Sequence, residues 1–239
     1  QLARDWIIGM QGKDGGWGAF DSNNNYSYLN YIPFADHGAL LDPSTADVSA
    51  RCLSFLCQIG DSQHPAVKRA LRFLEAEQEA NGSWFGRWGT NYIYGTWSVL
   101  CALNAAGVPQ SSSCVKAAVK WIKSKQRLDG GWGESGDSYY PERTSESLKK
   151  FSTPSQTSWA LLGLMAAGEV NSSSTHKGIR YLIDAERDGP KWNEENYTSV
   201  GFPRVFYLRY HGYSAYFPLW ALSRYRCLIE KNESSTIWG

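Results

Sequence analysis

The sequence predicts an all-α fold, a partial (α/α) barrel or toroid, and three observations lead to this prediction. A Gln-x-x-x-Gly-x-Trp string recurs along the 239 residues. An amphipathic helical pattern precedes each copy, and a more apolar helical pattern follows it after a loop. Because half-buried and fully buried helices alternate, the chain suits two concentric layers, outer helices around inner ones. We assign residues 1–239 to one domain of this type.

The repeated string has three complete copies and a degenerate fourth copy. The complete copies begin at Gln11, Gln78 and Gln126. The fourth has Glu186 in the glutamine position and Pro190 in the glycine position. An aromatic residue stands five positions before each string: Trp6, Phe73, Trp121 and Tyr181. Agreement at two separate offsets indicates a true repeat.

We interpret the string as structural. A glutamine amide can hydrogen-bond to a neighbouring helix end, a tryptophan can stack on that amide, and glycine permits a tight turn. The string is therefore expected to fasten the outer layer and to take no part in chemistry.

The helices follow in order from hydrophobic periodicity. Residues 1–11 read as the late part of an outer helix, and further outer helices are expected at 66–78, 115–126 and 177–186. Inner helices are expected at 47–59, 96–106, 156–167 and 215–227. The first three inner helices meet a glycine where a left-handed C-terminal residue belongs: Gly60, Gly107 and Gly168. No β-alternation of useful length is visible.

Three connections are long enough to suggest a functional role, at 18–46, 133–155 and 193–213. The chain also contains 11 Trp, 14 Tyr and 9 Phe, which suggests a repeated structural use of tryptophan or a cavity with aromatic walls.

The bulk properties exclude several classes of function. A net charge of +1 gives no electrostatic basis for binding nucleic acid. The five Cys have no CxxC spacing, which favours a reducing compartment. The His, Cys, Asp and Glu residues form no metal-ligand spacing, so no metal site is expected. No apolar run approaches the roughly 18 residues that a transmembrane helix needs.

Longer strings resemble, in order, the C-terminal part of squalene–hopene-type triterpene cyclases. They are GGWGAFD at 15–21, IPFADHG at 32–38, DPSTADVSAR at 42–51, GSWFGRWGTNYIYGTW at 82–97, STPSQTSWAL at 152–161 and GFPRVFYLRY at 201–210. The resemblance implies a cofactor-free carbocationic cyclisation of squalene to pentacyclic hopene or hopanol. The tract around 30–50 is similar to the hopene-type branch rather than to oxidosqualene cyclases.

Two departures from the family pattern concern the acid that starts the reaction. The family's initiating acid lies in an Asp-x-Asp-Asp motif, which is not found in this sequence. The resemblance places that motif before residue 1, so residues 1–239 alone are expected to be inactive. Arg51 stands where the family often has a histidine that partners the acid.

The polar candidates are two aspartates and this arginine. From spacing alone, Asp47 and Arg51 share a helix face and favour a simple salt bridge. The resemblance instead implies that Asp42 and Asp47 belong to the hydrogen-bond network behind the initiating acid, with Arg51 as its partner. Arginine can stabilise the conjugate base, but it cannot shuttle a proton as histidine can.

Aromatic faces can stabilise a carbocation without trapping it, by about 2 kcal/mol per ring in a dry site. The resemblance implies that the cavity walls include Phe20, Trp88, Tyr94, Phe202, Phe206, Tyr210 and Tyr213. The last four are spaced 4-4-3 and could form one helical stripe, although such a stripe taken alone is more often ordinary core. Phe34 matches a residue at the constriction through which substrate enters.

Other functions remain open at this point. A related cyclase could act on another polyprene or on oxidosqualene. A protein prenyltransferase β subunit has the same toroid but needs zinc ligands, which are not visible. A non-catalytic binding toroid of the complement type would carry Gly-Cys-Gly-Glu-Gln, which is absent, and a decayed pseudoenzyme is a further alternative. The resemblance also implies monotopic attachment to the cytoplasmic face of a membrane, and a homodimer.

Overall fold

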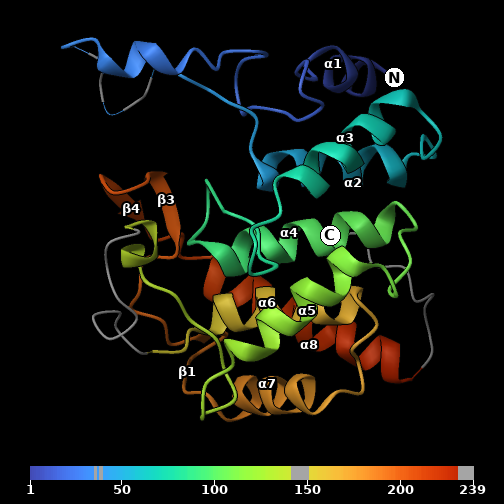
Figure 1. The fold of residues 1–239 in the computed structure, drawn as a ribbon. Helices are drawn as coiled ribbons and strands as arrows, with labels where there is room; N and C mark the ends of the chain where they lie inside the picture. Colours follow the sequence, from blue (N-terminus) through green and yellow to red (C-terminus); the bar gives the residue numbers. More distant parts are fainter. Residues whose placement is uncertain (35–36, 38–39, 141–150, 231–239) are drawn as a thin grey trace.

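The computed structural model describes residues 1–34, 37, 40–140 and 151–230, and this part of the chain is mainly helical (Figure 1). The outer helices are α1 (Leu2–Gly9), α3 (Pro65–Ala76), α5 (Ser113–Ser124) and α7 (Ser173–Asp184). The inner helices are α2 (Ala46–Gln58), α4 (Tyr92–Ala105), α6 (Pro154–Ala166) and α8 (Tyr213–Ile229). The expected order of outer and inner helices is confirmed.

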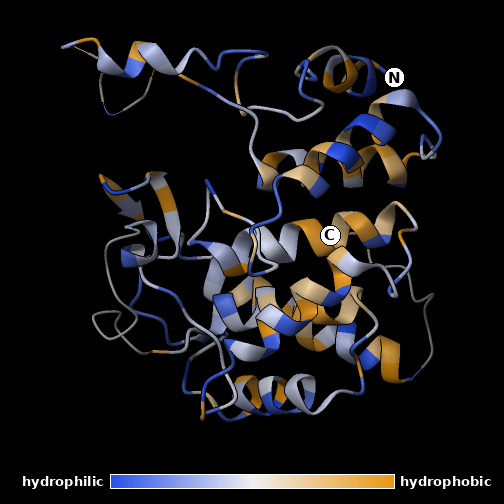
Figure 2. Cartoon of the chain, in the orientation of Figure 1, coloured by the Kyte–Doolittle hydropathy of each residue, from blue (hydrophilic) through white to orange (hydrophobic). Residues whose placement is uncertain are grey.

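The inner helices form a continuous row in which α2 contacts α4, α4 contacts α6, and α6 contacts α8. The outer helices α3, α5 and α7 each pack on the inner helix that precedes or follows them. The arrangement is a partial (α/α) toroid. Figure 2 shows apolar residues gathered in the inner layer, while α3 and α7 mix hydrophilic and apolar residues.

Burial follows the periodicity of the sequence. Every residue of α6 is buried, because its sequence is apolar or small on all sides. By contrast α3 buries only one face, which carries Val67, Ala70, Phe73 and Leu74. Gly60, Gly107 and Gly168 have φ values of +94°, +73° and +81°, so each inner helix from α2 to α6 ends on a left-handed glycine.

The repeated glutamines fasten each turn to the next outer helix. The Nε2 of Gln11, Gln78 and Gln126 donates to the glycine carbonyl of its own string at 2.8, 2.9 and 2.8 Å. The same amide donates to a carbonyl in the first turn of the following outer helix, at 2.9, 2.9 and 2.8 Å. The structural interpretation of the string is therefore supported by its contacts.

The repeated tryptophans face the other way along the chain. The indole Nε1 of Trp17, Trp84, Trp132 and Trp192 donates to the carbonyl ten residues earlier, in the preceding outer helix, at 2.6–2.8 Å. All four side chains are buried. Each of the three complete strings therefore joins two consecutive outer helices through one indole and one amide.

Two short hairpins were not predicted. Strands β1 (Arg187–Asp188) and β2 (Lys191–Trp192) form the first hairpin, which lies within the degenerate fourth string. Strands β3 (Ser199–Phe202) and β4 (Phe206–Leu208) form the second hairpin, in which Phe202 lies opposite Phe206. The expected helical stripe through Phe202, Phe206, Tyr210 and Tyr213 is wrong. Pro203 opposes a helix here, and Arg204 turns the chain with φ +70°.

The elements that matter for the site lie at one end of the inner layer. The N-termini of α2, α4 and α6 are on the side of the β3–β4 hairpin, with the segment around the 3₁₀ helix η1 (Ser27–Tyr31) above them (Figure 1). A second 3₁₀ helix, η2 (Gly136–Tyr139), also lies near this hairpin. Among the described helices, none combines the length and apolarity needed to cross a membrane.

Candidate active site at the N-terminal ends of the inner helices

A cavity of about 360 Å³ opens at the N-terminus of α2. Its lining is formed by Ala19, Phe20, Asp47, Val48, Arg51, Trp88 and Tyr94. Five of the residues singled out from the sequence thus meet around one space, although they come from three separate stretches of the chain. Phe20 meets the Trp88 ring edge-on, with centroids 5.8 Å apart.

Asp47 holds the loop that carries Trp88, here called the Trp88 loop (residues 86–91). Its Oδ2 accepts the backbone N–H of Arg87 at 2.9 Å and of Trp88 at 2.8 Å. Its Oδ1 accepts the Thr45 hydroxyl at 2.6 Å and the Val48 N–H at 3.0 Å. The side chain is 2% exposed, so this carboxylate replaces water as the partner of buried donors.

Other backbone groups of the Trp88 loop are bonded by side chains of η2 and α6. The Tyr139 hydroxyl lies 2.6 and 3.0 Å from the carbonyl oxygens of Gly86 and Gly89. The Gln156 amide donates to the Thr90 carbonyl at 2.9 Å.

Strand β3 and a buried glutamate complete the loop. The Trp88 carbonyl accepts the Val200 N–H at 3.2 Å, and the Thr90 N–H donates to the Thr198 carbonyl at 2.9 Å. Glu134 accepts the N–H groups of Asn91 and Ile93, at 3.1 and 2.8 Å, where α4 begins. A buried loop whose backbone is held by this many partners has one preferred geometry, which suits an active-site wall.

Asp42 does similar work for the segment that carries Phe20. Its carboxylate accepts the N–H groups of Ala19, Phe20 and Asp21 at 3.1, 2.5 and 2.7 Å. Both aspartates therefore position aromatic residues of the cavity through the backbone.

Arg51 does not form the salt bridge with Asp47 that their spacing suggests. Its Nη2 donates to Ser98 at 3.3 Å, and its guanidinium lies 4.1 Å from the centre of the Trp97 ring. The Asp47 oxygens are already occupied by four donors, which explains why Arg51 turns to α4. Arg51 remains at the cavity wall as a fixed positive charge.

Behind Tyr94 the inner helices form an aromatic cluster. Tyr94 meets the buried indoles of Trp97 and Trp159 edge-on at 5.6 and 5.0 Å, and these two indoles stack with centroids 5.8 Å apart. Tyr213 and Phe217 from the start of α8 pack against Trp159 at 6.0 and 5.5 Å. Burial raises the pKa of Tyr94 to about 12, so its hydroxyl stays neutral near pH 7.

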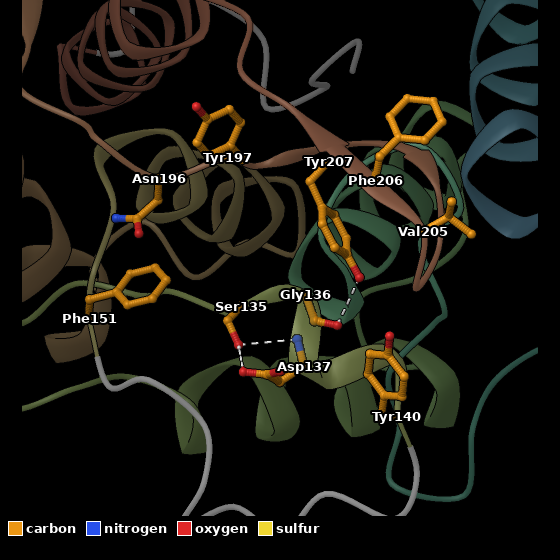
Figure 3. A pocket seen from close by; sticks show the side chains of 10 residues that line it. All are labelled: Ser135, Gly136, Asp137, Tyr140, Phe151, Asn196, Tyr197, Val205, Phe206 and Tyr207. Atoms are coloured by element: carbon orange, nitrogen blue, oxygen red, sulfur yellow. Dashed lines mark hydrogen bonds between the residues drawn. The ribbon is translucent and has the colours of Figure 1, made fainter.

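The remaining predicted wall residues do not line this cavity. Phe206 is 44% exposed and lines a separate pocket of about 560 Å³ with residues of η2 and β4 (Figure 3). Phe202 packs on Phe206 at 5.6 Å. Tyr210 is half exposed and contacts Tyr213 at 5.1 Å. Phe34 is 81% exposed, and its neighbours 35–36 and 38–39 in the quoted IPFADHG string lie outside the described residues.

Sequence reasoning missed several polar residues that shape the site. Gln156 is fully buried and accepts the Glu134 N–H at 3.0 Å while its amide donates to the loop. Glu194 accepts both the N–H and the hydroxyl of Ser155 at 2.8 Å, at the start of α6. Burial raises the pKa of Glu134 and of Glu194. The only feature of the sequence that could have pointed to Glu134 and Glu194 is their position, two residues after a repeated tryptophan.

The described residues contain no group of three or more His, Cys, Asp and Glu side chains that could hold a metal ion.

Comparison with known proteins matches this chain to one family. Residues 1–227 match the family model described as squalene-hopene cyclase C-terminal domain. The squalene–hopene cyclase of Zymomonas mobilis is 58% identical over 238 residues, and that of Alicyclobacillus acidocaldarius is 44% identical over 227 residues. The alignments cover 99% and 95% of this chain but 36% of each relative.

A solved structure supports the fold. The apo type II terpene cyclase MstE from Scytonema aligns with a TM-score of 0.64 at 18% identity, over 96% of this chain and 68% of that one. The chain thus spans little more than a third of the length of its curated relatives, and within that span it belongs to the squalene–hopene cyclase family, as its C-terminal domain.

Proposed function

We propose that the protein containing this chain cyclises squalene, or a closely related polyprene, to pentacyclic triterpenes of the hopene and hopanol type. The observation that carries the proposal is the cavity where Phe20, Trp88 and Tyr94 meet Arg51 and Asp47. Ring faces attract a carbocation and offer no lone pair, so they extend its lifetime where a base or water would quench it. The family's squalene–hopene cyclases support squalene as the substrate.

Arg51 is the residue suited to stabilise the conjugate base of the initiating acid. Protonation of a terminal alkene needs a carboxylic acid whose conjugate base is stabilised, and a nearby guanidinium provides that stabilisation. In this proposal the acid comes from an Asp-x-Asp-Asp segment outside these residues. It transfers its proton to the alkene carbon, and the tertiary cation that results is attacked by the next double bond. Proton loss gives a hopene, and capture by water gives a hopanol.

We also infer that the protein is monotopic, attached to the cytoplasmic face of a membrane, and that it forms homodimers. Squalene is an apolar chain that partitions into bilayers, and an enzyme that takes it up benefits from contact with the membrane surface. Flotation with liposomes and light scattering in detergent would test these two inferences. No association with liposomes, or a monomer at micromolar concentration, would contradict them.

The decisive experiment incubates the intact protein with squalene in detergent and identifies the products by gas chromatography with mass spectrometry. Pentacyclic products without added cofactor support the proposal. Conversion of oxidosqualene in preference to squalene would favour the alternative cyclase, and no conversion of either would favour a binding toroid.

Substitution of wall residues tests the cavity itself. Trp88→Ala is expected to release partly cyclised products, because a cation that loses a stabilising face loses a proton early. Phe206→Ala is also expected to release partly cyclised products. Unchanged product spectra in both variants would contradict the role of the ring faces.

A further inference from the structure

Arg87 lies between two aromatic residues assigned to the wall, although it was not among the site residues expected from the sequence. Its guanidinium carbon is 4.2 Å from the centre of the Trp88 ring and 5.3 Å from that of Phe202. Its Nη1 donates to the Gly201 carbonyl at 2.9 Å. One side chain thus connects the Trp88 loop with strand β3.

The side chain stands behind the wall and not in the cavity. Arg87 is absent from the residues that line the cavity, whereas Trp88 belongs to them. The guanidinium instead stacks on the Trp88 ring, 4.2 Å from its centre. Its backbone N–H is fixed by Asp47 at 2.9 Å, so both ends of the residue are held.

The chemistry of the group suits positioning rather than acid–base work. Arginine remains protonated at any working pH, and its planar fork can stack on rings and donate in fixed directions. Burial lowers the pKa of Arg87, while Asp47 and Asp42 oppose that shift from a distance. Among the described residues, no carboxylate approaches Arg87 within 4.0 Å, so ring contacts and one carbonyl define its place.

The charge of Arg87 works against a carbocation, which leaves geometry as its contribution. A fixed positive charge beside the Trp88 ring repels a cation held at that ring. The contribution of Arg87 to cyclisation must therefore be something other than its charge. The structure offers one candidate, which is the fixed relation between the Trp88 ring and the hairpin that carries Phe202.

We infer that Arg87 is a positioning residue for cyclisation, which sets the Trp88 and Phe202 rings relative to each other and so controls how many rings close. This inference rests on the proposed cyclase function. A wall ring displaced by about 1 Å can lower turnover by about 10²-fold. The displaced wall would also let the cation lose a proton before the last ring closes.

The test compares Arg87→Met, which removes charge and donors, with Arg87→Lys, which retains charge but not the planar fork. Both are made in the intact protein. Positioning predicts that kcat falls on the order of 10- to 100-fold in both variants while KM stays within about 3-fold, and that partly cyclised products increase. An electrostatic role instead predicts that Arg87→Lys retains the wild-type products, and that result would overturn the inference.

Arg187→Met is the matched control, because Arg187 also stacks on a tryptophan, Trp192, at 4.5 Å, but belongs to the fourth string. It should leave the products unchanged, and the same shift there would overturn the inference. A double-mutant cycle with Phe202→Ala adds a second readout. If Arg87 acts through that ring, Arg87→Met should add little in the Phe202→Ala background. Full additivity would count against it.

A readout independent of turnover separates this inference from the proposed function. Failure of the wild-type protein to convert squalene would refute the proposed function. The crystal structure of Arg87→Lys still decides the positioning role in that case. Displaced Trp88 or Phe202 rings support it, and rings that superimpose on the wild type overturn it.

Discussion

Replacement of Asp47 by alanine tests whether this carboxylate anchors the cavity wall or serves the initiating acid. The substitution leaves the N–H groups of Arg87 and Trp88 without their acceptor, 2.9 and 2.8 Å away in the wild type. Each orphaned buried donor costs about 1–3 kcal/mol, so the pair costs about 2–6 kcal/mol. A chain of 150–250 residues loses about 2–4 °C of Tm per kcal/mol.

We therefore expect Asp47→Ala to lower the Tm by about 4–24 °C in differential scanning fluorimetry. Asp47→Asn should lower it less, because one amide oxygen can still accept from both N–H groups. Its NH₂ group then faces the Val48 N–H as a second donor. The exposed Asp184→Ala serves as the control.

The refuting result is equally specific. A network behind the acid needs the Asp47 charge but not its bonds to the Trp88 loop. If Asp47→Ala abolished turnover while its Tm stayed within about 1 °C of the wild type, the anchoring argument would be wrong.

Two further predictions concern stability. Gly82→Ala should destabilise the protein more than Gly107→Ala. Both glycines have a positive φ, so either substitution costs about 1–2 kcal/mol of strain, but only at Gly82 would the new Cβ meet a backbone oxygen of α5, at 2.6 Å. Equal losses of Tm in the two variants would contradict this close approach. Burial raises the Glu134 pKa above 4.5, so the folded state binds the extra proton and stability falls as pH rises through the window above 4.5. Glu134→Gln should flatten the difference in unfolding free energy across that window, and an unchanged slope in urea titrations at several pH values would refute it.

Much of the helical framework could be predicted from the sequence because its signals are local. Periodicity in 66–78 placed α3 within two residues at its end, and Gly60, Gly107 and Gly168 marked where inner helices stop. The kind of group that the repeated glutamine binds could also be predicted, because the free backbone groups near a turn are mostly those of helix ends.

The β3–β4 hairpin could not be predicted from spacing. The 4-4-3 interval of Phe202, Phe206, Tyr210 and Tyr213 fits a helix, but Pro203 and a positive φ at Arg204 turn the chain instead. The Pro203-Arg204 turn therefore outweighed the helical spacing of the aromatic residues.

The polar half of the site was hidden for a different reason. Gln156, Glu134 and Tyr139 satisfy backbone groups of a loop that lies 43 to 66 residues away in the chain. Which groups of an irregular loop lack partners is known only once the inner helices are assembled. Asp47 and Arg51 show the same effect, because a pair that is ideal on one helix separates when better donors approach from elsewhere.

The amide links between outer helices have a consequence for how the molecule comes apart. Gln11 ties its turn to α3, Gln78 to α5 and Gln126 to α7, so each repeat is coupled chiefly to its successor. Damage to one link should loosen two adjacent units and leave distant ones protected from amide exchange. Unfolding would then proceed repeat by repeat, starting from the repeat whose link is lost.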